Sequence, residues 1–146
     1  NSGGIRDSLP AGRITYRDVL KMQPFGNTLV VVELTGAQLR DYLAAAVRMT
    51  PGSGGFVQVS GAALTAEGGR LVAATIGGAP IDTARTYRLA LNRFMAAGGD
   101  GYPKLDNHPG FVDTGFVDAQ ALREYLAAHS PLKIADFDPA HSIVRR

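Results

Sequence analysis

The sequence has 146 residues, of which 45% are hydrophobic and 19% charged, values that are typical of one globular domain and exclude a disordered chain. The formal net charge is +2 and the basic residues are scattered apart from Arg145-Arg146, so neither a nucleic-acid-binding patch nor nucleic acid as a partner is predicted. No run of about 20 apolar residues predicts a membrane span, and the lack of Cys excludes disulfides, thiolate metal sites and Cys nucleophiles.

The first third of the sequence predicts two helices around one strand. Residues 15–22 place apolar side chains on one helical face behind a Thr suited to cap it, and Pro24 ends this helix. Residues 28–34 are rich in β-branched side chains and predict a largely buried strand. Residues 35–49 begin with the capping-box pattern of Thr three positions before Gln, and their apolar residues recur at helical spacing until Pro51.

The remainder predicts short strands and a final helix. Four runs of alternating or β-branched residues, separated by Gly-rich turns, predict strands. They lie at residues 56–59, 62–66, 71–76 and 87–92. Asp118 is expected to cap an amphipathic helix that turns Leu122, Tyr125 and Leu126 inward. We therefore expect a single domain over residues 1–146, of the α/β class in its mixed α+β form.

No group of residues has the spacing of a self-contained catalytic centre. The three histidines, His108, His129 and His141, lack the HxH or HExxH spacing of metal ligands, and surface or loop positions are expected for them. No Ser lies in a Gly-x-Ser-x-Gly elbow, and no two carboxylates are marked out as an acid–base pair. The chain alone is therefore expected to be inactive, without catalytic or metal-binding residues.

Two Gly-rich segments are candidates for contact with a ligand. Residues 1–6 place an exposed backbone beside Arg6, whose guanidinium can hold phosphate or carboxylate oxygens. The alternative for this segment is a simple turn with a solvated Arg. Residues 52–55 lack the Gly-Lys-Ser/Thr ending of a phosphate-binding loop and follow a helix rather than a strand. They are expected to form a flexible connection with at most one glycine against a ligand.

Two aromatic residues lie in unusual settings. Phe25 occupies the turn-forming segment 23–27, and Phe94 precedes the Gly-rich segment 97–102. A large ring in a Gly-rich loop is suited to present its face to a planar ligand, although anchoring of the loops to the core is an equal alternative. Asp100, between two glycines, is suited to accept hydrogen bonds from paired sugar hydroxyls.

Four motifs, in chain order, carry a family resemblance. They are Asn1-x-Gly3-x-Ile5-Arg6, Gln23-Pro24-Phe25-Gly26-Asn27, Leu34-Thr35-Gly36 and Phe94-x-x-x-Gly98-Gly99-Asp100-Gly101-Tyr102. Together they resemble the C-terminal domain of the 5′-nucleotidase family, most closely its bacterial periplasmic UDP-sugar hydrolase/5′-nucleotidase members. The similarity continues nearly to the C-terminus, through Leu105-Asp106-Asn107 and Asp113-Thr114-Gly115-Phe116.

This resemblance implies a part of a two-domain enzyme that acts in the periplasm or at the cell surface. The family's N-terminal metallophosphoesterase domain holds two divalent metal ions and a His–Asp pair, and metals of this kind activate water and neutralise phosphoryl charge. That domain and the metals are not in this sequence and are the implied partners. The C-terminal domain, a mixed sheet with flanking helices, captures the nucleotide or nucleoside and carries it to the metals by a large rotation.

The resemblance also implies roles for individual residues. Phe25 and Phe94 are expected to sandwich the base, Asp100 to accept hydrogen bonds from the ribose hydroxyls, and Arg6 to bind the phosphate or ribose side. Asn1 and Asn27 are expected to supply polar contacts, and Gly54 to line the base pocket. Tyr102 belongs to the last motif and is expected to give structural support.

One departure from the family pattern affects both fold and binding. Family members carry a helix and a strand ahead of the first motif, together with further arginines that contact phosphate. Since this sequence begins at the motif, the fold is expected to lack its first strand and helix, and the phosphate grip to be incomplete. The alternatives to a 5′-nucleotidase or UDP-sugar hydrolase are a 2′,3′-cyclic-nucleotide phosphodiesterase/3′-nucleotidase of the same architecture and a non-catalytic nucleoside-binding module.

Overall fold

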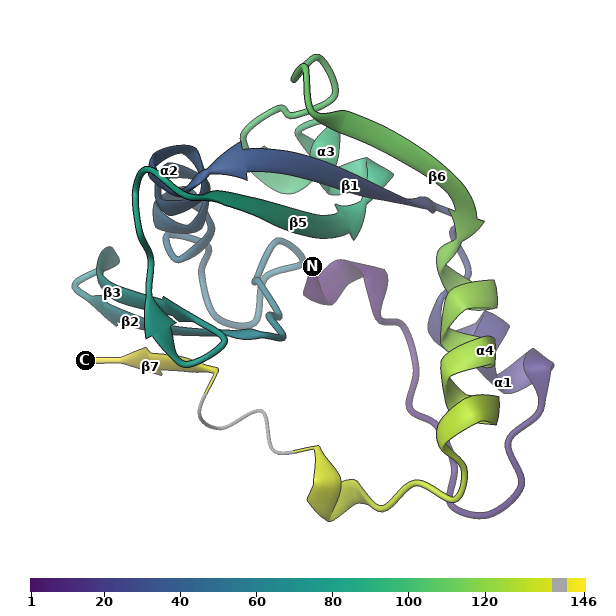
Figure 1. Cartoon of the computed structure of the whole chain (residues 1–146). Helices are drawn as coiled ribbons and strands as arrows, with labels where there is room; N and C mark the ends of the chain where they lie inside the picture. The colour runs from purple at the N-terminus through teal and green to yellow at the C-terminus, as the bar shows by residue number, and fades with distance from the viewer. Residues whose placement is uncertain (138–141) are drawn as a thin grey trace.

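The computed structural model describes residues 1–137 and 142–146, and Figure 1 shows how their elements are arranged. The helices are α1 (Tyr16–Met22), α2 (Gly36–Ala46), α3 (Arg93–Ala96) and α4 (Asp118–His129). Single 3-10 turns form η1 (Ser2–Gly4), η2 (Gly99–Gly101) and η3 (Ile134–Asp136). The strands are β1 (Thr28–Thr35), β2 (Ala62–Glu67), β3 (Arg70–Ile76), β4 (Ala79–Pro80), β5 (Thr86–Asn92), β6 (Phe111–Val117) and β7 (Ile143–Arg145).

The strands form two sheets rather than one. The first has the order β5-β1-β6 with antiparallel neighbours, and the second has the order β4-β3-β2-β7. In the second sheet β7 runs parallel to β2, whereas the β2–β3 and β3–β4 pairs are antiparallel. The mixed α/β class predicted from the sequence is confirmed.

The core lies where α2 meets both sheets (Figure 1). Along β1, Val30, Val32 and Leu34 are at most 1% exposed, as the alternation of a strand with one buried face requires. From the second sheet, Leu64 of β2 joins the same cluster, and α2 contributes its apolar face. On the far side, α1 packs against α4 beyond the end of β6. No helix in the described part of the chain is long and apolar enough to cross a membrane.

Two predicted helix caps are confirmed. At the start of α2, the Thr35 amide donates to Gln38 Oε1 at 2.8 Å and the Gln38 amide donates to Thr35 Oγ1 at 3.3 Å, the reciprocal pair of a capping box. At the start of α1, the amide and the hydroxyl of Thr15 donate to Asp18 Oδ2 at 2.9 and 2.6 Å. Both caps satisfy backbone donors that a helix terminus leaves unpaired.

The Asp18 cap predicts a pH-dependent contribution to stability. The hydrogen bond from the Thr15 side chain, followed by that from its backbone, lowers the pKa of Asp18. A lowered pKa means that the stabilisation is complete above the unfolded pKa of about 3.9 and is lost as the pH falls through the folded pKa. Asp18→Asn should therefore lower the free energy of unfolding at pH 7, and the difference from wild type should shrink below about pH 4. Urea titrations across this range would contradict the account if the difference were independent of pH.

Several expectations were wrong in detail. Residues 56–59 form no strand, because the Phe56 carbonyl accepts the amide of Ser2 at 2.8 Å rather than a strand partner. The helix predicted over residues 35–49 ends at Ala46, where its last turn tightens and the Met49 amide donates to the Ala46 carbonyl at 3.2 Å.

The final helix also differs from its prediction. Val117, not Asp118, is the N-cap of α4, and the Asp118 amide donates to the Asn27 carbonyl at 2.8 Å. Leu122 and Leu126 are half-buried as expected, but Tyr125 is 44% exposed and its ring stacks on His129 with the centroids 4.1 Å apart. The stacking partner follows four residues later on the same helix face, which gives Tyr125 a local contact in place of the core.

Candidate functional site

The N-terminal turn and the Gly-rich loop after α2 are joined by their backbones. The Gly3 amide donates to the Gly54 carbonyl at 2.7 Å, and a Cβ atom on Gly3 would lie 3.1 Å from the Gly54 Cα. On the other side of the loop, a Cβ on Gly55 would lie 3.1 Å from the Asp100 Cβ. The expectation of a flexible connection at residues 52–55 is therefore wrong for Gly54 and Gly55, which are held between η1 and η2.

Asp100 stands where these segments meet. It is the one described residue other than glycine with a positive φ, +56°, a conformation that costs energy and clusters at functional sites. The Asn1 side-chain amide donates to Asp100 Oδ2 at 2.6 Å, and the Asn92 side-chain amide in turn donates to Asn1 Oδ1 at 3.1 Å. Asp100 is exposed, and its Oδ1 accepts no hydrogen bond from the described residues, so that oxygen is free to accept one from a ligand.

Phe94 lies against Gly99, the residue before Asp100. The Asn92 side chain caps α3 by accepting the Met95 amide at 2.8 Å, and this short helix presents Phe94 with 42% of its surface exposed. The ring passes directly over Gly99, where a Cβ atom would lie 2.4 Å from its tip. Phe94 is therefore not a core residue: its ring covers the backbone that leads into Asp100.

Arg6 and Phe25 form a second group. The Arg6 guanidinium carbon lies 5.9 Å from the centroid of the Phe25 ring, within the range of a cation–π contact. The Arg6 amide donates to the Met22 carbonyl at 2.8 Å, which ties the N-terminal segment to the end of α1. Phe25 is 58% exposed. Its neighbour Asn27 is half-buried, with its carbonyl oxygen held by the Asp118 amide.

The structure thus joins the predicted residues in two groups along one short segment. Asn1, Gly54, Asp100 and Phe94 surround η1 and η2, whereas Arg6 and Phe25 contact each other at the other end of residues 1–6. The stacked ring pairs in the described residues are Tyr42–Tyr102 and Tyr125–His129, so Phe25 and Phe94 do not stack on each other. Two exposed, unstacked rings are available to a planar ligand.

Tyr102 supports the site from its buried side. It is 3% exposed, its hydroxyl donates to the Gly55 carbonyl at 2.6 Å, and its ring stacks on Tyr42. Burial, with a smaller effect of the Asp100 carboxylate, raises the pKa of Tyr102 to about 12, so the hydroxyl remains a donor at neutral pH. This position agrees with the structural role expected for Tyr102.

Two supporting residues were missed by the sequence analysis. Asn92 holds both Asn1 and the start of α3, and its only sequence signal is an N-cap residue type at the end of a predicted strand. Arg145 of β7 donates to the Val47 and Met49 carbonyls at 3.0 and 3.3 Å and lies 5.0 Å from the Phe56 ring centroid. It thereby fixes both ends of the loop that carries Gly54, and its two hydrogen bonds span 98 and 96 positions of the chain.

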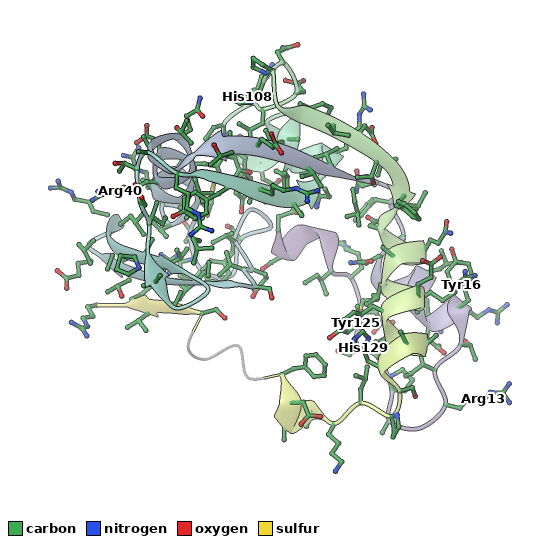
Figure 2. The ribbon with its side chains drawn as sticks, viewed as in Figure 1. Arg13, Tyr16, Arg40, His108, Tyr125 and His129 are labelled. Carbon is green, nitrogen blue, oxygen red and sulfur yellow. The ribbon has the colours of Figure 1, made fainter. Side chains whose placement is uncertain are left out.

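Other parts of the molecule lie away from this site. Figure 2 shows His108 near the start of β6 and His129 at the end of α4, so these two histidines do not meet; His141 lies outside the described residues. In residues 1–137 and 142–146, no three His, Asp or Glu side chains gather in a way that fits a metal ion. A hollow of about 270 Å³ is lined by Arg40 of α2, by β3 and by Ile81, and includes none of the predicted site residues.

The sequence and the structure both match known proteins. Residues 1–107 match the family model described as 5′-nucleotidase, C-terminal domain. Protein UshA of Escherichia coli K12 is 48% identical over 139 residues, 95% of this chain and 25% of UshA. A 5′-nucleotidase of Vibrio cholerae is 48% identical over 146 residues, 100% of this chain and 26% of that protein. The crystal structure of a 5′-nucleotidase precursor from Thermus thermophilus matches with a TM-score of 0.78 and 35% identity, covering 98% of this chain and 30% of that one. The chain spans about a quarter of the length of these curated relatives.

Proposed function

Because the chain belongs to the 5′-nucleotidase C-terminal domain family, we propose that it is the substrate-binding domain of a hydrolase that cleaves phosphate esters of nucleotides. The preferred activities are those of a 5′-nucleotidase or a UDP-sugar hydrolase. The observation that carries the proposal is the environment of Asp100: a strained, exposed carboxylate with one oxygen that accepts no hydrogen bond from the described residues, next in the chain to Gly99, over which the exposed Phe94 ring lies. A free acceptor next to a bare aromatic face suits a ribose joined to a base.

Each residue then has a chemical role in binding. Phe25 and Phe94 stack on opposite faces of the base, which favours every base because each has a π-face. Asp100 Oδ1 accepts hydrogen bonds from the ribose hydroxyls, while Oδ2 is held in place by the Asn1 amide. Arg6, whose guanidinium contacts the Gly3 carbonyl at 3.5 Å and the Phe25 ring, binds the phosphate. Two further residues contribute to substrate binding. The Asn27 side-chain amide makes a polar contact, and Gly54 lines the place where the base binds.

The bond cleavage itself is assigned to another part of the protein. We assign to this chain the binding and orientation of the substrate, through the residues named above. We place the cleavage in a metallophosphoesterase domain with two divalent metal ions, outside residues 1–146. This chain would be the substrate-binding part of that protein, and the periplasm or the cell surface its location.

The role of Arg6 is tested by comparing a nucleotide with its nucleoside. Arg6→Ala in the full-length enzyme should weaken binding of AMP about tenfold or more, since a charged hydrogen bond contributes roughly 1.5–3 kcal/mol. Binding of adenosine, which lacks the phosphate, should change much less. Arg40→Ala, which removes a similar charge at the separate hollow on α2, is the control. Equal losses for AMP and adenosine would move Arg6 to the ribose or to a structural role.

Gly99→Ala tests whether the observed position of Phe94 matters. A Cβ on Gly99 would lie 2.4–2.6 Å from three atoms of the Phe94 ring, so the ring must move. Because it is 42% exposed, it can swing away with little change in the melting temperature. Affinity for AMP, measured by calorimetry, should nevertheless fall about as far as in Phe94→Ala. Wild-type affinity in Gly99→Ala would show that the ring does not bind from this position.

A further inference from the structure

One carboxylate connects the two segments that carry the exposed rings. Asp113 of β6 forms an ion pair with Arg93 through Oδ2, and the same oxygen accepts the Thr28 hydroxyl at 3.1 Å. Its other oxygen, Oδ1, accepts the Gly115 amide at 3.0 Å. Thr28 follows Phe25 by three residues and opens β1, whereas Arg93 directly precedes Phe94 and opens α3. Two segments that are 65 positions apart in sequence (93 − 28) therefore meet on one side chain.

The surrounding contacts make this connection stiff on the Phe25 side. The Thr114 hydroxyl donates to the Leu29 carbonyl at 2.7 Å, and the Asp118 amide donates to the Asn27 carbonyl at 2.8 Å. Side chains of β6 and the first amide of α4 therefore bind three consecutive residues after Phe25, from Asn27 to Leu29. The pairing of β1 with β6 shifts register between Thr28 and Val30, so the ladder is irregular there and side-chain contacts replace it.

On the Phe94 side, the contact is a charged one. The Gly115 amide, the Arg93 side chain and the Thr28 hydroxyl lower the pKa of Asp113, so the carboxylate is ionised at neutral pH. Hydrogen bonds between ionised groups are shorter and stronger than neutral ones. The Arg93 side chain is 62% exposed and that of Asp113 is 26% exposed, so Asp113 is the more fixed member of the pair and Arg93 is drawn to it.

We propose that Asp113 is a positioning residue that sets the separation of Phe25 and Phe94 and thereby the affinity for the base. This inference rests on the proposed function of the two rings. A base stacked on both faces needs the rings about 7–8 Å apart, twice the normal contact distance between carbon atoms. Both rings are exposed, at 58% and 42%, and neither is held by core packing. Their spacing depends on the segments that carry them, which are joined by the Leu29–Asn92 pairing of β1 with β5 and by the side chain of Asp113.

The test uses the full-length protein and measures dissociation constants without added divalent metal, so that no ester is cleaved. The ligands are AMP, UMP and ribose 5-phosphate, the last of which lacks a base. Asp113→Ala should weaken AMP and UMP binding about three- to tenfold, less than the loss of a whole stacking ring, and leave ribose 5-phosphate unchanged. Glu67→Ala, which breaks the Glu67–Arg146 contact on β2, is the matched control and should bind all three ligands as wild type.

Three further variants separate positioning from general destabilisation. Thr28→Val removes only the hydroxyl and keeps the side-chain shape, and it should give a smaller loss of the same kind even if Asp113→Ala folds poorly. Asp113→Asn keeps one acceptor oxygen but loses the other acceptor and the charge, and it should recover part of the affinity. Adding Asp113→Ala to Phe94→Ala should cause less extra loss than in wild type, because residues that act through each other are not additive.

The outcomes for the inference and for the proposed function are distinct. If Phe25→Ala and Phe94→Ala weaken base binding but Asp113→Ala and Thr28→Val do not, the Asp113 inference is overturned and the proposed function stands. If Asp113→Ala weakens AMP and ribose 5-phosphate equally, Asp113 is a general structural residue and the inference is again overturned. If the two Phe variants bind AMP as wild type, the stacking function fails and the inference fails with it.

Discussion

Replacing Phe25 or Phe94 by Ala should raise the Michaelis constant of the full-length enzyme roughly tenfold or more for purine and pyrimidine nucleotides alike. Stacking of a base on an aromatic ring contributes roughly 1–3 kcal/mol and tolerates any base. Phe→Leu should recover only part of the loss, because Leu restores apolar area without a flat ring. Phosphate esters that lack a base should be nearly unaffected. Steady-state kinetics with AMP, UMP and a base-free ester measure this directly.

The exposure of the two rings makes this result separable from a loss of stability. A core Phe would cost about 3–5 kcal/mol on truncation, but Phe25 and Phe94 are 58% and 42% exposed. Their Ala variants should therefore melt close to wild type. Phe137, which is 46% exposed near η3, gives a control variant that removes an equally exposed ring from elsewhere. Reduced stability with unchanged nucleotide kinetics would make the rings loop anchors instead.

The largest effect on stability is expected at Gly36, the first residue of α2. A Cβ atom there would lie 1.9 Å from the Asp82 carbonyl oxygen and 2.7 Å from its carbon. The strand-connecting turn cannot retreat freely, because the Gly36 amide donates to the Arg85 carbonyl at 2.7 Å and the Ala37 amide to the Thr83 carbonyl at 3.1 Å. Gly36→Ala should cost about 3 kcal/mol, at the upper end for an overpacked site.

Denaturant unfolding measures this cost, with a substitution at the neighbouring residue Ala37 as the control. Ala37→Gly lies one position later in the same first helical turn, is exposed, and should cost less than about 1 kcal/mol. A Gly36→Ala variant as stable as this control would mean that the turn at residues 82–85 does not press on α2. The close approach of the Asp82 carbonyl thus explains why a glycine ends the motif Leu34-Thr35-Gly36, one of those that carry the family resemblance.

Local sequence patterns predicted the regular elements of this fold well. The cap at Thr15, the capping box at Thr35 and the buried alternation of β1 depend on residues a few positions apart, and all are present. Strand β6 was missed, because Val112 and Phe116 point outward at 58% and 52% exposed and therefore give no pattern of one buried face. The short strands β4 and β7 carry too few residues for any periodic signal.

The candidate site was named from motifs, but its geometry was not predictable from them. The Asn1–Asp100 hydrogen bond joins residues 99 positions apart, and Arg145 reaches Val47 across 98 positions. Such contacts depend on how the sheets and loops pack, which no local pattern records. Asp113 was noted only as part of a family motif, and its position between the two ring-bearing segments emerged from the fold.

The most direct test of the central claim is to map AMP binding on this chain by NMR. We expect saturable shifts for Phe25, Phe94 and Asp100, and with ribose 5-phosphate we expect the shifts at the two rings to disappear. The hollow beside Arg40 and Ile81 provides the internal comparison, since it is separate from the site. Saturable shifts at that hollow, or none anywhere at millimolar AMP, would contradict a nucleotide-binding role for the surface around Asp100.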